Sequence, residues 1–356
     1  MKDGPVKKIL ALLLLSVSVP AVASPSDDLE QVVRDHWSWI LVNNPVFATT
    51  QGDRRFDDKL GDVSLAHRDA EAKQALNFAK RLNAIPDAEL SPAERTNKGV
   101  LLRLVTEQAE DNSFGQRMML FSTYDGWHQS FAGLADILPF YKKADYEGYL
   151  KRLKAYAPMN REAIRITREE LKKGYVQPCD ALGGFENTIM GAVDAAPDKT
   201  RFFEPFTRTR PNDLTETDWV AMQAEAAVII ATDLKPEYKA FSDFYLTEYK
   251  PKCSKTIAAS ALPQGTAYYA QRARVHTTTD LSPDQIHAIG ISEVARIRTR
   301  MEKVASDAGF PTREAFIRHL RTDPKYYAKS PAELMAEAKR QIMTEIGSLH
   351  LRTRTI

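Results

Sequence analysis

Three segments of the chain carry the same signature of an α-helix N-terminus. Each has a serine followed by a proline, with a glutamate or glutamine three residues after the serine: Ser91-Pro92-Ala93-Glu94, Ser282-Pro283-Asp284-Gln285 and Ser330-Pro331-Ala332-Glu333. The serine hydroxyl can accept a hydrogen bond from a backbone N–H of the first turn, and the acid or amide can bond back to the cap. Proline suits the first helical position because its missing N–H would have no partner there. These starts favour a helical fold.

Apolar residues recur at helical spacing through most of the chain. Besides the helices that begin after the three serines, this spacing predicts helices over residues 27–42, 65–82, 146–155, 161–173, 219–231, 237–249 and 313–321. The alternation at residues 118–122 is not sustained, as it would be in a strand. We therefore predict an all-α, multi-helix fold. Any subdomain boundary is expected in the turn-rich residues 194–213.

The N-terminus has the pattern of a secretory signal peptide. Lys2, Lys7 and Lys8 precede an apolar run at residues 9–19, and Ala21-Val22-Ala23 is a small-residue cleavage site. We expect residues 1–23 to be removed after Ala23, which places the rest in the periplasm or outside the cell. No later run is long enough for a membrane helix, so no membrane partner is expected after cleavage.

The charge balance argues against a nucleic-acid partner. The chain has 49 basic and 47 acidic residues, and residues 1–23 contain three of the lysines and one aspartate. The remaining chain therefore has 46 of each and a formal charge of zero. Proteins that bind nucleic acids usually present a strongly basic surface.

Only two cysteines are present, Cys179 and Cys253. In an oxidising compartment an isolated pair predicts a disulfide. The alternative is two separate buried thiols, and without a nearby histidine pattern the pair is a poor zinc site.

Short motifs of known chemistry are absent. No two of the seven histidines are four residues apart, so the chain has no His-Glu-x-x-His motif, in which both histidines share a helix face and reach one zinc ion. It also lacks the Gly-x-Ser-x-Gly elbow of serine hydrolases and the glycine-rich loops of nucleotide sites. We therefore predict no catalytic residue, metal ligand or cofactor within this chain.

Two aromatic–histidine clusters are candidates for a substrate cleft. Trp127 and His128 lie in the first, and Tyr268, Tyr269 and His276 lie in the second, together with Arg272 and Arg274. Rings, imidazoles and guanidinium groups could bind a peptide or another small molecule. The first cluster could equally be a loop held over the core by its aromatic rings. The second could be a helix end whose threonines bond to local backbone groups.

Several motifs in combination resemble the bacterial family of domain of unknown function 885. They span residues 28–345: Asn44-Pro45, Gly52-Asp53-Arg54-Arg55, Gly126-Trp127-His128, Asp145-Tyr146-Glu147-Gly148-Tyr149-Leu150, Tyr268-Tyr269 and His276-Thr277-Thr278-Thr279-Asp280 with the helix that follows. The family is similar to secreted, zincin-like metallopeptidases. The resemblance therefore implies a zincin-like helical scaffold and a zinc-dependent peptidase-like hydrolase.

The metal-binding motif of that family has no counterpart here, so no zinc ligand or catalytic glutamate is carried over. Residues 24–346 then represent an incomplete family domain, and residues 347–356 a tail that does not resemble the family. A frameshift or premature stop near Ile346 would explain this ending. The resemblance implies zinc for a full-length member and an inactive N-terminal portion here. The alternative is a stand-alone helical protein that binds peptides or another envelope component, with its substrate and oligomeric state undefined by the sequence.

Overall fold

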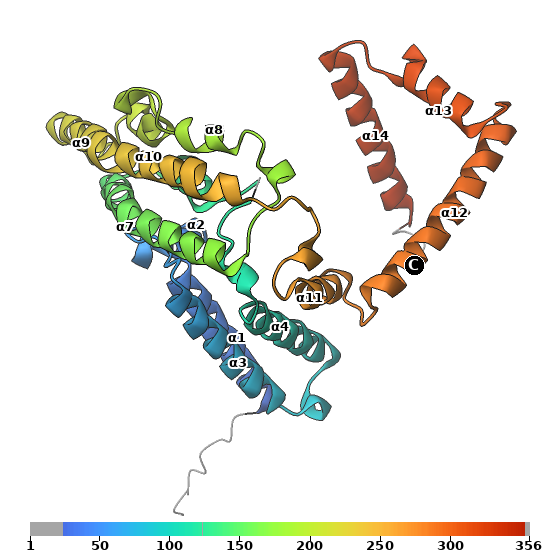
Figure 1. Cartoon of the computed structure of the whole chain (residues 1–356), viewed down its shortest axis with the longest axis horizontal. Helices are drawn as coiled ribbons and strands as arrows, with labels where there is room; N and C mark the ends of the chain where they lie inside the picture. The colour runs from blue at the N-terminus through green and yellow to red at the C-terminus, as the bar shows by residue number, and fades with distance from the viewer. Residues whose placement is uncertain (1–23, 123, 353–356) are drawn as a thin grey trace, which may run out of the picture. The chain divides into compact units, whose positions relative to one another are not determined.

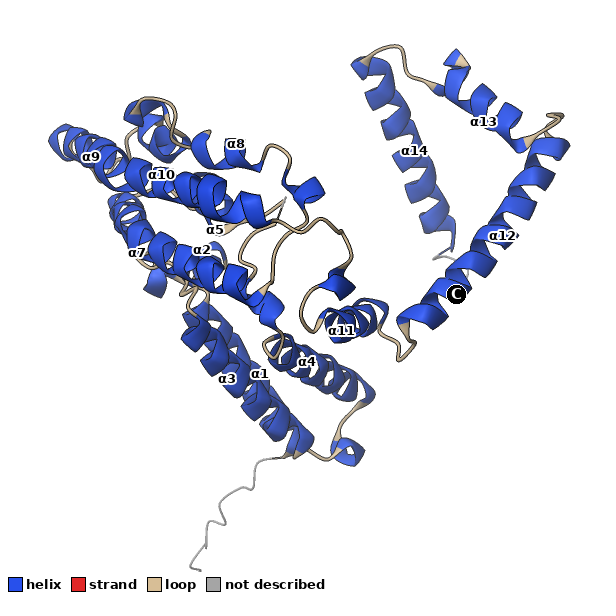
Figure 2. Cartoon of the chain, in the orientation of Figure 1, coloured by secondary structure: helices blue, strands red, loops and turns tan. Residues whose placement is uncertain are grey.

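The structure, a computed structural model, describes residues 24–122 and 124–352, and the expected signal peptide lies outside this range. All named elements in these residues are helices, joined by loops (Figure 2). The described residues form two isolated β-bridges, Phe121–Gly126 and Pro178–Ser254. The prediction of an all-α fold is confirmed.

The chain divides into two compact units, the first ending at Gln271 and the second beginning at Arg272. The division falls within α11 (Gly265–Thr277) and not in residues 194–213, where we expected a boundary. Those residues pack into the first unit through the buried Phe202, Phe203 and Phe206. The α-helices before α11 are α1 (Pro25–Asn43), α2 (Pro45–Thr50), α3 (Leu65–Asn83), α4 (Pro92–Asp111), α5 (Trp127–Ala132), α6 (Leu134–Ile137), α7 (Lys143–Lys173), α8 (Phe185–Met190), α9 (Glu216–Ile229) and α10 (Lys235–Phe244). Those after it are α12 (Pro283–Asp307), α13 (Arg313–Thr322) and α14 (Pro331–Arg352).

The predicted helix starts are confirmed at α4, α12 and α14. Ser91 Oγ accepts from the Glu94 backbone N–H, and the Ser91 backbone N–H donates to Glu94 Oε2 at 2.7 Å. Ser282 and Gln285 form the same capping box. At α14 the return bond differs, because Glu333 accepts from the backbone N–H of Lys329. Local sequence chemistry therefore sets all three helix starts.

Helices α1, α3 and α4 form the N-terminal part of the first unit (Figure 1). Their apolar faces meet in one core cluster that includes Leu29, Phe78, Leu82 and Val105. A second and larger cluster, rich in aromatic rings, lies between α5, α7, α8, α9 and α10.

Helix α7 corrects a sequence prediction. Residues 146–155 and 161–173 were expected to form two helices, but they lie in one helix of 31 residues with Pro158 inside it. An internal proline removes one backbone hydrogen bond and disfavours the helix by about 3 kcal/mol. Tertiary packing offsets this cost, because Tyr156 and Asn160 on either side of Pro158 are fully buried.

A buried arginine on α7 holds the segment after α2. Arg152, which is 1% exposed, donates from Nε to the carbonyl oxygen of Lys59 at 2.8 Å. Its Nη2 atom bonds to Thr49 Oγ1 at 2.7 Å and to the carbonyl oxygens of Pro45 and Phe56. Burial lowers the pKa of Arg152 to about 10, which still leaves the guanidinium charged at neutral pH.

Two of the motifs that carried the family resemblance meet beside Arg152. Arg54 forms an ion pair with Asp145, whose carboxylate also accepts from the backbone N–H of Tyr141. A Cβ atom on Gly148 would lie 2.8 Å from the carbonyl oxygen of Asp57, so only glycine fits without a shift. These motif residues therefore join α2 and its following loop to α7.

Helix α12 ends as its sequence predicted. Gly309 has φ of +81°, and the N–H groups of Gly309 and Phe310 bond to the carbonyl oxygens of Ser306 and Ala305, which is the Schellman arrangement. The predicted apolar stripe is exposed, however, at Ile289, Val294, Ile297, Met301 and Val304, and Ala305 is the buried residue of this helix.

We predict that Arg152→Ala lowers the free energy of unfolding by about 3 kcal/mol, because several buried carbonyl and hydroxyl acceptors lose a charged donor. Denaturant titration followed by circular dichroism measures the change. Lys151→Ala is the matched control, because Lys151 lies next to Arg152 with a side chain that is 64% exposed and should change stability by less than about 0.5 kcal/mol. Equal losses in the two variants would contradict the role of Arg152.

Candidate functional site

The first predicted cluster is held in the aromatic core. Trp127, 8% exposed, donates from Nε1 to Asn160 Oδ1 at 2.8 Å, and its ring centroid lies 4.2 Å from that of Phe241. Asn160 in turn donates to the backbone and side-chain oxygens of Glu237. This geometry supports the interpretation of the cluster as a loop held over the core.

His128 is fully buried and its tautomer follows from its partner. Thr188 Oγ1 donates its hydrogen to the carbonyl oxygen of Phe185, so it accepts one from His128 Nε2 at 3.0 Å. The Nδ1 atom has no hydrogen-bond partner and lies against Gly126, where a Cβ would approach it to 2.9 Å. Burial lowers the pKa of His128 to about 4, so the imidazole is neutral at neutral pH.

The predicted disulfide is present and joins two loops of the first unit. Cys179 and Cys253 have Cα atoms 5.0 Å apart, within the usual range. Beside it, the N–H of Cys179 bonds to the carbonyl oxygen of Ser254, and the N–H of Ser254 bonds to that of Gln177. The loops before Cys179 and after Cys253 are therefore fixed side by side.

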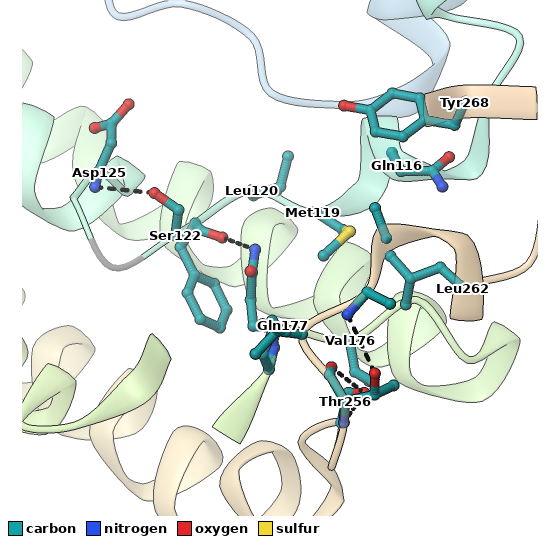
Figure 3. Close-up of a pocket in the computed structure, with 16 residues that line it drawn as sticks. Gln116, Met119, Leu120, Ser122, Asp125, Val176, Gln177, Thr256, Leu262 and Tyr268 are labelled. Atoms are coloured by element: carbon teal, nitrogen blue, oxygen red, sulfur yellow. Dashed lines mark hydrogen bonds between the residues drawn. The ribbon is translucent and has the colours of Figure 1, made fainter. Parts of the chain in front are cut away.

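These two loops line a cavity of about 450 Å³, together with the segment that precedes α5 (Figure 3). Pockets for small ligands typically enclose about 300–1,000 Å³. Apolar and polar side chains both line it: Gln116, Met119, Leu120, Phe121, Ser122, Asp125, Val176, Gln177, Pro178, Ser254, Thr256, Ile257, Ala258, Ala259, Leu262 and Tyr268. We take this cavity as the candidate functional site.

The polar groups of the cavity are arranged by local hydrogen bonds. Gln177 donates from Nε2 to the carbonyl oxygen of Phe121 at 2.7 Å, which joins two walls of the cavity. Ser122 Oγ accepts from the backbone N–H of Asp125, and Asp125 Oδ1 accepts from Gly126 N–H and from Ser130. Figure 3 shows Asp125 and Tyr268 at opposite sides of the view of the lining residues.

A buried acid supports the wall at Gln177. Tyr249 donates from its hydroxyl to Glu170 Oε1 at 3.0 Å and accepts from the backbone N–H of Gln177. Tyr249 belongs to a π-helical turn that follows α10, within the region where the sequence predicted a regular helix. Burial raises the pKa of Glu170 well above its ordinary value. The cause of this shift is that an apolar setting disfavours the charged carboxylate.

The five predicted cleft residues do not converge on this cavity. Tyr268 lines it, with its ring 5.5 Å from that of Phe114, whereas Tyr269 is exposed. Trp127 and His128 lie in the core, and His276 belongs to the second compact unit, where Nε2 lies 2.9 Å from Arg272 Nη2. Thr277 Oγ1 bonds to the carbonyl oxygen of Ala273, as the helix-end interpretation of the second cluster predicts.

Most of the lining residues were not predicted from the sequence. Gln116, Gln177 and Ser254 belong to no motif, and they come together through the fold. One available signal was the cysteine pair, since a disulfide at Cys179 and Cys253 necessarily brings Gln177 and Ser254 close together.

Zinc, which the family resemblance implies for a longer protein, does not fit the residues described. No group of three or more His, Cys, Asp or Glu side chains in residues 24–122 and 124–344 is placed to hold a metal ion. We therefore derive no metal-dependent step for this chain. The described helices also include none long and apolar enough to cross a membrane.

The fold and cavity define an all-α protein with a site of ligand size. The family described as "Bacterial protein of unknown function (DUF885)" matches residues 45–352. The chain therefore belongs to this family, as its motifs predicted, and the match continues into the segment beyond Ile346 that we expected not to resemble it.

Comparison with solved structures shows the same fold in another protein. The crystal structure of "the putative lipoprotein from Colwellia psychrerythraea" superposes with a TM-score of 0.78 at 16% sequence identity. The match covers 92% of this chain and 60% of that one, so this chain spans about three fifths of its length. No curated protein matches the chain.

We predict that His128 makes stability fall as the solution is acidified. The folded-state pKa of about 4 lies below the ordinary value of 6.5, so the unfolded chain takes up the proton first. The loss begins as pH falls below 6.5 and reaches about 3 kcal/mol as pH passes through 4. Denaturant titrations of wild type and His128→Gln between pH 7 and pH 4 measure it, and identical pH slopes in the two proteins would contradict the buried neutral state.

We predict that replacing both Cys179 and Cys253 by serine lowers the free energy of unfolding by about 4 kcal/mol, because a bridge across 74 residues restricts the unfolded chain. Thermal and denaturant unfolding report the change. Reduction of the wild type should produce the same shift and should leave the serine variant unaffected. A wild type that is insensitive to reduction would overturn this prediction.

Proposed function

We propose that this chain is a peptide-binding helical portion of a zinc-dependent peptidase-like hydrolase, and that it does not hydrolyse peptides by itself. The observation that carries the binding proposal is the cavity of about 450 Å³ whose walls are joined by the disulfide and by Gln177. Its mixed apolar and amide lining is suited to a short peptide, which presents both kinds of group.

The described residues contain no group that could hold a metal ion, which supports the proposal that this chain does not hydrolyse peptides by itself. The exposed stripe of α12 supports the idea of a longer protein. An amphipathic helix normally buries its apolar face, yet Ile289, Val294 and Ile297 are each 45–49% exposed. We propose that further polypeptide of a full-length family member covers this stripe.

The proposed location is the periplasm or the outside of the cell, after cleavage of a signal peptide behind Ala23. The disulfide supports an oxidising compartment. The similar structure is that of a "putative lipoprotein", and lipoproteins are exported proteins. The second candidate function is that of a stand-alone protein that binds an envelope component, and the same cavity would then be its binding site.

We predict saturable binding of short peptides, zinc far below one equivalent per chain and no cleavage of a peptide library. Ala258→Trp should abolish binding, because residue 258 lines the cavity from an exposed position. Ala261→Trp is the matched control, since Ala261 lies in the same loop outside the cavity lining. Calorimetry, metal analysis and mass spectrometry provide the measurements.

Stoichiometric zinc together with chelator-sensitive cleavage would overturn the proposal that this chain is catalytically incomplete. Peptide binding that survives in Ala258→Trp would move the binding site away from the cavity. The first result concerns catalysis and the second concerns the binding site, so each can occur without the other.

A further inference from the structure

One side-chain atom of the cavity wall is buried without a hydrogen-bond partner. Gln116 is 9% exposed, and its Oε1 atom has no partner, while its Nε2 atom lies 3.4 Å from the carbonyl oxygen of Pro263. A carbonyl oxygen can only accept, so this contact fixes which end of the amide is the donor. The atom without a partner is therefore the amide oxygen, which is shielded from solvent and offers no open acceptor to a ligand.

Asp125 adds a negative charge at the rim of the same cavity. Its Oδ1 atom accepts from Gly126 and Ser130, whereas no bond within the described residues engages Oδ2. The side chain is exposed, so a ligand can reach it.

No lysine, arginine or histidine is among the lining residues that the structure describes. The nearest lysine along the chain, Lys255, has its Nζ atom 3.7 Å from Cys179 Sγ. The described lining therefore contains one carboxylate and no basic side chain to balance its charge. A ligand that brings a positive group can pair with this carboxylate, and a charge-assisted hydrogen bond is stronger than a neutral one.

We infer that the cavity selects peptides that carry a positive group, an α-ammonium or a lysine or arginine side chain, which pairs with the exposed carboxylate of Asp125. The apolar residues of the lining, among them Met119, Leu262 and Tyr268, pack against the uncharged part of the peptide. This inference rests on the proposed peptide-binding function and adds its specificity.

Four tripeptide amides with the same leucine and phenylalanine at the first two positions test the inference. Three are N-acetylated and carry lysine, glutamine or glutamate at the third position, and the fourth has glutamine there and a free α-amine. The lysine peptide should bind about fivefold more tightly than its glutamine counterpart, and the glutamate peptide more weakly. Comparison of the fourth peptide with the acetylated glutamine peptide shows whether an α-ammonium serves as well as a side chain.

Asp125→Asn should remove the preference for the lysine peptide, because asparagine keeps the Oδ1 acceptor for Gly126 and Ser130 but has no charge. Asp180→Asn is the matched control, since Asp180 is exposed and lies outside the cavity lining. The preference should also shrink with added salt.

The outcomes separate this inference from the proposed function. Equal affinities for the lysine, glutamine and glutamate peptides, with binding still abolished by Ala258→Trp, would overturn the charge selection and leave peptide binding intact. A preference for lysine that persists in Asp125→Asn would overturn the role of Asp125. Failure of all four peptides to bind would overturn both proposals.

Discussion

The side-chain amide of Asn160 is fully hydrogen-bonded inside the core, and the arrangement of the first unit depends on it. Its oxygen accepts from Trp127 Nε1 at 2.8 Å, and its nitrogen donates to two oxygens of Glu237 at 2.9 and 3.0 Å. Glu237 also pairs with Arg161 at 2.6 Å. Buried polar groups are costly unless they are satisfied, so these bonds fix α5 and α10 against α7 in one register.

Helix α7 repeats this principle along its length. Arg152 holds the segment after α2, Asn160 holds Trp127 and Glu237, and Glu170 holds Tyr249, which in turn bonds to the backbone of Gln177 in the cavity wall. The long helix therefore continues through Pro158 because buried partners on both sides stabilise it. The disulfide between Cys179 and Cys253 joins the two loops that line the cavity.

Local features were predictable from the sequence, and features set by distant contacts were not. The structure confirms the helix caps at Ser91 and Ser282 and the helix end at Gly309, each of which depends on a few neighbouring residues. It also confirms the disulfide, which was predictable because the chain has only two cysteines. The prediction of two helices around Pro158 was wrong. Proline disfavours a helix locally, but tertiary packing stabilises one continuous helix here. The cleft prediction joined Trp127, His128 and His276 by residue type, but burial places the first two in the core. The amides that do line the cavity carry no sequence signature.

The first unit is a helical scaffold, and we propose that it recognises a ligand. We propose that the cavity between the disulfide-linked loops and the segment before α5 is the binding site. The most direct measurement is a crystal structure of the protein with the acetylated leucine–phenylalanine–lysine amide. We predict the peptide inside the cavity, with its ammonium within hydrogen-bond distance of Asp125. A peptide bound on another surface, with the cavity filled by water alone, would contradict it.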